Sequence, residues 1–296
     1  MNDIASPSTH AAGRSPVPEG ACKDIAVHLD GSSEDDVRLA HAEALAAGFR
    51  ARLTGLFTNL LPNPTFYMED FAALAMSDLI DVISEKGDVT ERRLRERFAR
   101  LDPLHELRRI EAFPGSLEEA VATEARWNDL FVATCPRDEG NERWNTMIER
   151  VMFEGGRGLV LLPPKAPLRL AIRTVLIGWV DTGQSARAVA EALPFLRQAT
   201  RVHVAMVREK AHGRMGGAEV LTDITAHLAR HGVEATASVL GPEAAPAEGL
   251  LAEAGRISAD LIVAGAYGHS RFREWVLGGV TKELLATSPL PLLMAH

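Results

Sequence analysis

The chain has little cysteine, few aromatic residues and no long apolar run. Two cysteines in 296 residues are too few for a disulfide framework or a cysteine-based zinc site, and a reducing compartment is the simplest setting for them. No apolar stretch approaches the ~20 residues of a membrane span, and residues 1–20 lack the apolar core of a signal peptide. We therefore expect a cytoplasmic protein with a disordered tail over residues 1–21, no structural metal and no disulfide.

The charge balance disfavours nucleic acid as a partner. The formal net charge is -8, whereas a protein that binds the phosphate backbone usually gathers Lys and Arg on one face. The one dense basic run, from Arg92 to Arg100, is interleaved with Glu91 and Glu96, which is typical of a solvated helix face. We expect neither nucleic acid nor a membrane to be bound.

A repeat emerges when the chain is compared with itself. Strand-like apolar runs alternate with helical patterns, which predicts a parallel α/β architecture. Residues 128–133 resemble residues 259–264, and residues 158–163 resemble residues 289–294. Both matches have the same offset, since 260 − 129 and 289 − 158 both equal 131. The equal spacing indicates a duplicated domain.

The repeat divides the chain into a first domain over residues 22–164 and a second over residues 168–296. Prolines at positions 163, 164 and 167 interrupt regular structure between them. The first strands, near residues 24–29 and 174–177, lie 150 apart instead of 131, so the first domain holds an insertion of 150 − 131 = 19 residues. We place it within residues 59–101, where a helical pattern runs from about Glu69 to Ser84 and predicts an extended helix or a lid.

The most informative segment begins where a buried strand, residues 261–264, runs into Gly265 and Gly268. Nine residues later come Gly278, Gly279 and Val280, and then a helix over residues 282–286. Glycine lets the backbone approach a ligand closely, and a helix N-terminus offers unpaired N–H groups and partial positive charge. Together they suggest a phosphate site at the carboxyl end of a parallel sheet.

This pattern resembles the phosphate loop of the universal stress protein family, Gly-x2-Gly-x9-Gly-Ser/Thr. Gly265, Gly268 and Gly278 take the three glycine positions, while Gly279 replaces the expected Ser or Thr. In the first half, the segment Leu29-Asp30-Gly31-Ser32 resembles the family's Asp-Gly-Ser motif. Residues 178–194 are also similar to tandem bacterial members. The likeness covers nearly the whole chain after residue 22.

The resemblance implies two tandem Rossmann-like domains, each a mainly parallel five-stranded sheet with helices on both faces. It also implies that they pack as a pseudo-dimer through their terminal strands, near residues 159–162 and 290–293. ATP or another adenine nucleotide, with magnesium, is then expected in the second domain alone. The candidate binding residues are Gly265, Gly268, His269, Ser270, Gly278, Gly279, Val280 and Asp181.

Two departures from the family pattern separate the halves. The first half has Thr134, Arg137 and Met147 at the three glycine positions, and such side chains should obstruct a phosphate. In the second half Val180 stands at the position of the family's nucleotide-contacting Asp or Asn, with Asp181 one place later. Nucleotide binding is therefore expected in the second half, with an affinity reduced by the missing hydroxyl at Gly279.

Three functions stay open at the level of sequence. The first is a nucleotide-binding regulatory module of the stress response, and the second is a nucleotide-free interaction protein. The third is an enzyme, either a slow ATPase or a relative of the adenine nucleotide alpha-hydrolases. The stretch around Ser270 resembles a nucleophile elbow but lacks its second glycine, and no general base stands out. We therefore expect no catalytic residue. A homodimer is an open option, and no protein partner can be named.

Overall fold

The computed structural model describes residues 22–63, 70–101, 104–135, 142–207, 217–241, 245–266 and 279–296. Its first half contains β1 (Asp24–Leu29), α1 (Asp35–Phe49), β2 (Arg52–Leu60), α2 (Asp70–Phe98), β3 (Glu106–Ala112), α3 (Ser116–Ala125), β4 (Leu130–Thr134), α4 (Glu142–Glu154) and β5 (Gly158–Leu162). Its second half contains β6 (Thr174–Gly178), α5 (Gly183–Gln198), β7 (Arg201–Val207), α6 (Gly217–Arg230), β8 (Ala235–Leu240), α7 (Pro246–Arg256), β9 (Leu261–Gly265), α8 (Gly279–Thr287) and β10 (Leu292–Ala295).

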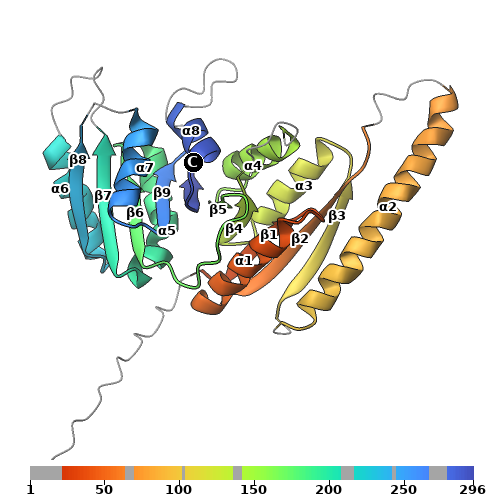
Figure 1. Cartoon of the computed structure of the whole chain (residues 1–296), viewed down its shortest axis with the longest axis horizontal. Helices are drawn as coiled ribbons and strands as arrows, with labels where there is room; N and C mark the ends of the chain where they lie inside the picture. Colours follow the sequence, from red (N-terminus) through yellow and green to blue (C-terminus); the bar gives the residue numbers. More distant parts are fainter. Residues whose placement is uncertain are drawn as a thin grey trace, which may run out of the picture.

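The ten strands form one sheet in the order β3-β2-β1-β4-β5-β10-β9-β6-β7-β8 (Figure 1). Within each half all neighbouring strands are parallel, whereas β5 and β10 pair antiparallel, with Leu161 opposite Leu292 and Leu159 opposite Met294. The predicted pairing of the two terminal strands is therefore confirmed. Each half supplies five strands, and the halves meet as a pseudo-dimer.

Successive side chains along each strand point to opposite faces of the sheet, and each face carries its own hydrophobic core. In β1, Ile25, Val27 and Leu29 belong to one core, and Ala26 belongs to the other. The first core is covered by α1, α5, α6 and the C-terminal part of α2, and the second by α3, α4, α7 and α8. Both cores include residues of both halves. In the first core, for example, the rings of Phe49 and Phe195 meet edge to face with their centroids 4.9 Å apart.

An aspartate repeated at the offset of 131 anchors the first strand of each half. The Asp129 carboxylate accepts hydrogen bonds from the backbone N–H groups of Lys23 and Asp24, at 2.7 and 3.1 Å. The Asp260 carboxylate accepts from the N–H groups of Arg173 and Thr174, at 2.9 Å each. The duplicated segments therefore share a structural task as well as a sequence.

Two features differ from the sequence-based expectation. The inserted helix, expected to end near Ser84, continues to Phe98 as the 29-residue α2, because Leu94 and Phe98 bury apolar side chains against the sheet. The basic run thus lies on this helix, where Arg97 pairs with Asp36 and Glu43 of α1. Cys22, which adjoins the expected tail, is buried in the first core, and its burial raises the pKa of the thiol to about 12.

Across the described residues, none of the helices combines the length and the hydropathy that a membrane span requires.

Replacing Asp260 with alanine should lower the free energy of unfolding by about 1.5–3 kcal/mol, because two backbone N–H groups lose a charged acceptor. Asp129→Ala should act in the same way on the first half. Urea denaturation followed by circular dichroism measures the change, with Asp223→Ala on the exposed side of α6 as the control. If both variants unfold at the wild-type midpoint, the carboxylates do not anchor the strands.

Candidate functional site

The order of the strands defines a switch point in each half. In the second half the chain runs from β6 outward to β7 and β8, and then returns to β9 and β10 on the other side of β6. Because β6 and β9 are parallel neighbours, with Gly178 opposite Ala264, their carboxyl ends lie side by side. Ligands of open α/β sheets bind at such a point. The candidate residue Asp181 lies three residues after the end of β6, and Gly265 is the last residue of β9.

Gly265 allows a close approach between β9 and the start of α5. A Cβ atom at this position would lie 2.6 Å from the backbone nitrogen of Ser185 and 2.7 Å from the carbonyl carbon of Gln184. Neither backbone atom can move without displacing the first turn of α5. Within the described residues, the need for glycine here is therefore explained by strand–helix packing.

Gly279 is the first residue of α8 and has a different environment. Since β9 and β10 are parallel, α8 must cross from the carboxyl edge of the sheet back to its amino edge, so its N-terminus lies at the edge where β9 ends. No described atom lies within 4 Å of a Cβ built on Gly279. Val280 follows and packs partly against the second core. The start of α8 therefore offers backbone N–H groups and room beside them.

The segment after β6 places its polar groups toward solvent. Trp179 is buried, Val180 is 48% exposed and Asp181 is exposed, with no hydrogen bond from its carboxylate to any described residue. Thr182 caps α5, its hydroxyl accepting from the N–H of Ser185 at 3.3 Å. Asp181 thus lies near the switch point, and its carboxylate is free of hydrogen bonds and ion pairs with the described residues.

Four of the candidate residues cannot be placed. Gly268, His269, Ser270 and Gly278 lie outside the described residues, as does Arg137 in the first half. Thr134 ends β4, and Met147 is fully buried in α4, so two of the three first-half counterparts are located.

The equivalent switch point of the first half is filled by side chains of the chain itself. Arg38 of α1 is 3% exposed and forms ion pairs with Asp30 and, at 2.6 Å, with Asp35. Its Nη1 lies 3.3 Å from Nδ1 of His28, which must accept because a guanidinium can only donate. His28 Nε2 then donates to the Thr58 hydroxyl at 2.9 Å. At the offset of 150, Arg38 corresponds to Ala188 and His28 to Gly178, so the second half has small residues in both places.

This cluster engages the acidic residue of the Asp-Gly-Ser motif. Burial alone would raise the pKa of the Asp30 carboxyl, but Arg38, His28 and the Ser32 hydroxyl together hold that pKa well below its usual range. Burial raises the pKa of Asp35 despite Arg38, and its carboxylate accepts from the N–H groups of Asp30 and Gly31 at 2.9 Å. The sequence analysis assigned Asp30 to the Asp-Gly-Ser motif but did not identify Arg38. The one sign of Arg38 in the sequence is that a charged residue stands where the second half has the apolar Ala188.

Comparison with known proteins agrees with this architecture. The sequence model of the universal stress protein family matches residues 171–296, which include the whole of the second sheet half. Residues 171–296 therefore belong to the universal stress protein family. The stress response protein NhaX of Bacillus subtilis is 40% identical over 52 residues, which cover 18% of this chain and 31% of NhaX. The chain thus matches less than a third of that relative's length.

Solved structures extend the likeness to both halves at the level of fold. A universal stress protein from Archaeoglobus fulgidus superposes with a TM-score of 0.66 at 15% identity, covering 92% of this chain and 95% of its own. A protein of unknown function from Pseudomonas aeruginosa PAO1 gives a TM-score of 0.55 at 15% identity, with 93% and 92% covered. At such low identity these neighbours show the tandem fold and nothing of the ligand.

Gly265→Ala should destabilise the protein by about 1–3 kcal/mol, because the added methyl meets the backbone of α5. Gly279→Ala is the matched control at the other end of the loop, and it should leave the unfolding midpoint nearly unchanged. Thermal melting of the two variants measures the difference. Equal midpoints would show that β9 does not depend on a close approach to α5.

Arg38→Leu should cost about 3–5 kcal/mol at neutral pH, because it leaves two buried carboxylates without their cation. Without Arg38 both carboxyls should have pKa values above those of the unfolded chain, so the loss should shrink as the pH falls through these raised values. Urea denaturation at neutral and mildly acidic pH tests this. A loss that is the same at both pH values would contradict the role of the ion cluster.

Proposed function

We propose that this universal stress protein is a cytoplasmic stress-response module that binds an adenine nucleotide, with ATP as the first candidate, in its second half. The proposed binding residues are Gly265, Gly268, His269, Ser270, Gly278, Gly279, Val280 and Asp181. Binding would act by changing a protein surface, because no residue of the proposed site is assigned a catalytic role.

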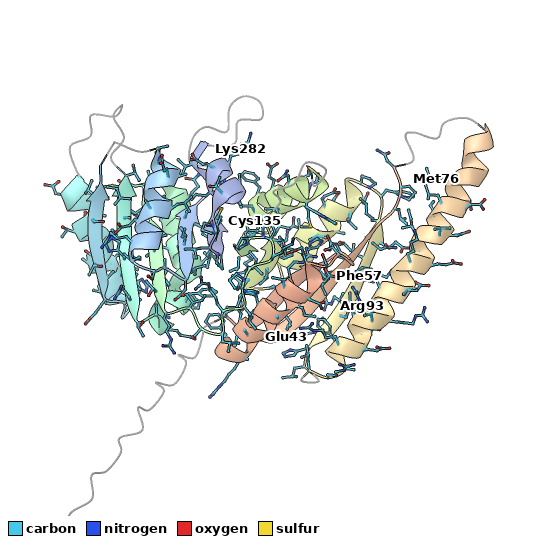
Figure 2. The ribbon with its side chains drawn as sticks, in the orientation of Figure 1. Glu43, Phe57, Met76, Arg93, Cys135 and Lys282 are labelled. Carbon is cyan, nitrogen blue, oxygen red and sulfur yellow. The ribbon has the colours of Figure 1, made fainter. Side chains whose placement is uncertain are left out.

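The observation that carries this proposal is the open start of α8 at the switch point. A helix N-terminus stabilises a phosphate through its free N–H groups and partial positive charge. Gly279 places no side chain between these groups and a ligand. Lys282, exposed on the first turn of α8 and labelled in Figure 2, adds a positive charge to the same helix end. Asp181 is available for the sugar, the base or a magnesium ion that accompanies the phosphates.

The first half supports the proposal by contrast. There Arg38, His28 and Trp144 occupy the region beside the strand ends, with the rings of His28 and Trp144 4.5 Å apart. A nucleotide in that half would have to displace a buried ion pair, which is costly. The proposal therefore assigns one nucleotide to each chain.

Substitutions at position 279 test the proposal by calorimetry with ATP and magnesium. Gly279→Glu should abolish binding by charge repulsion, and Gly279→Ala should retain it. Gly279→Ser should strengthen binding about tenfold, because it supplies a hydroxyl for one hydrogen bond to a charged group. Gln198→Glu, at the exposed far end of α5, is the control for added charge.

Wild-type protein that binds no nucleotide at millimolar concentration, roughly the weakest affinity of use to a cell, would favour a nucleotide-free interaction protein. Binding that survives Gly279→Glu but is lost in Arg38→Leu would move the site to the first half.

A further inference from the structure

Both backbone polar groups of Ala266 are bound by residues at the end of β10. Ala266 follows β9 directly, is fully buried, and precedes the proposed binding residue Gly268 by two positions. Its N–H donates to the carbonyl oxygen of Ala295 at 2.9 Å. Its carbonyl oxygen lies 3.0 Å from Nδ1 of His296, and this nitrogen must donate because a carbonyl can only accept. The chain that leaves β9 is therefore held by a side chain as well as by the sheet.

The first half contacts the same histidine. The ring of Phe153, on the last turn of α4, meets the His296 ring edge to face, with the centroids 4.6 Å apart. The register explains this contact: β5 and β10 are antiparallel with Leu159 opposite Met294, so the chain beyond β10 reaches the segment between α4 and β5. Figure 1 shows the end of β10, at the mark C, between α8 and α4. Phe153 is 48% exposed and so adds little to the hydrophobic core.

The segment that follows α4 also contacts α5. Arg187 of α5 donates from Nη2 to the carbonyl oxygen of Gly156 at 2.6 Å. Two residues earlier on the same helix is Ser185, whose backbone leaves room only for a glycine at position 265. The first half thus touches both neighbours of the carboxyl end of β9, the histidine after β10 and the start of α5.

The first half cannot form the histidine bond at its own switch point. There Cys135 follows β4, and its N–H donates to the carbonyl oxygen of Leu162 at 2.7 Å, as in the second half. The next residue is Pro163, which has neither an N–H nor a side-chain donor, so a bond like that of His296 is excluded. The contact is therefore specific to the half in which nucleotide binding is proposed.

We propose that His296 and Phe153 are positioning residues for the nucleotide site of the second half, so that the first half takes part in binding without holding a nucleotide itself. This inference rests on the function proposed above. His296 fixes the carbonyl group of Ala266, and Phe153 restricts the His296 ring to the orientation that donates. A chain that leaves β9 in one fixed direction loses less conformational freedom when it binds a phosphate, which favours binding. Because such coupling is reciprocal, a bound nucleotide should in turn affect Phe153.

Calorimetry with ATP and magnesium on full-length variants separates the hydrogen bond from the ring contact. His296→Phe keeps a ring and has no donor, so it should weaken binding about three- to tenfold, the effect of one hydrogen bond. His296→Asn keeps a donor near the place of Nδ1 and should recover most of the affinity. Phe153→Leu should weaken binding about threefold, because the His296 ring can then turn away from Ala266.

Two control variants and a melting curve separate positioning from a loss of structure. Phe113→Leu changes another phenylalanine of the first half, 37% exposed, and His227→Ala changes an exposed histidine of α6. Both should bind the nucleotide as the wild type does. The unfolding midpoint of every variant should lie well above the temperature of the binding assay, so that the affinities refer to folded protein.

Nuclear magnetic resonance follows the coupling itself. In the wild type, ATP with magnesium should shift the ring resonances of Phe153, which are assigned by their absence from Phe153→Leu. His296→Ala should remove most of this shift. A shift that persists in His296→Ala would overturn the inference, because the nucleotide would then affect Phe153 by another route.

Failure of this inference differs from failure of the proposed function. Wild-type protein that binds no nucleotide would remove both. If Gly279→Glu abolishes binding while His296→Phe and Phe153→Leu bind as tightly as the wild type, the proposed function stands and this inference alone is overturned. An affinity of His296→Asn as weak as that of His296→Phe would also overturn it, because the donor to Ala266 would not be what sets the affinity.

Discussion

The antiparallel pairing of β5 with β10 is the contact on which the architecture depends. Leu159, Leu161, Leu292 and Met294 are fully buried at this junction, so neither terminal strand is left as an exposed apolar edge. The pairing turns two five-stranded sheets into one and lets each core continue from one half into the other. Because the edges are buried within one chain, the two halves need no concentration-dependent association to cover them.

Joining the halves in one chain also let them diverge. In a dimer of identical single domains, a buried arginine at the switch point would fill both sites at once. Here Arg38 fills one site, while the corresponding position of the other half holds the small, uncharged Ala188. The first half thus contributes a rigid ionic cluster, whose internal pairing is costly to break. The second half retains glycine where β9 meets α5 and at the start of α8.

Much of this fold follows from short-range patterns. Apolar runs and helical periodicity predicted the parallel halves, and the offset shared by the two pairs of matched segments predicted the duplication. The length of α2 was underestimated, because its C-terminal turns are held by Leu94 and Phe98 within a charged stretch, where tertiary packing outweighs local composition. The ion cluster around Arg38 was missed, since pairing a buried charge with residues from two elements is a property of the folded chain. Gly265 was predicted as a ligand position, and its neighbours show in addition a packing constraint against α5 that local sequence could not reveal.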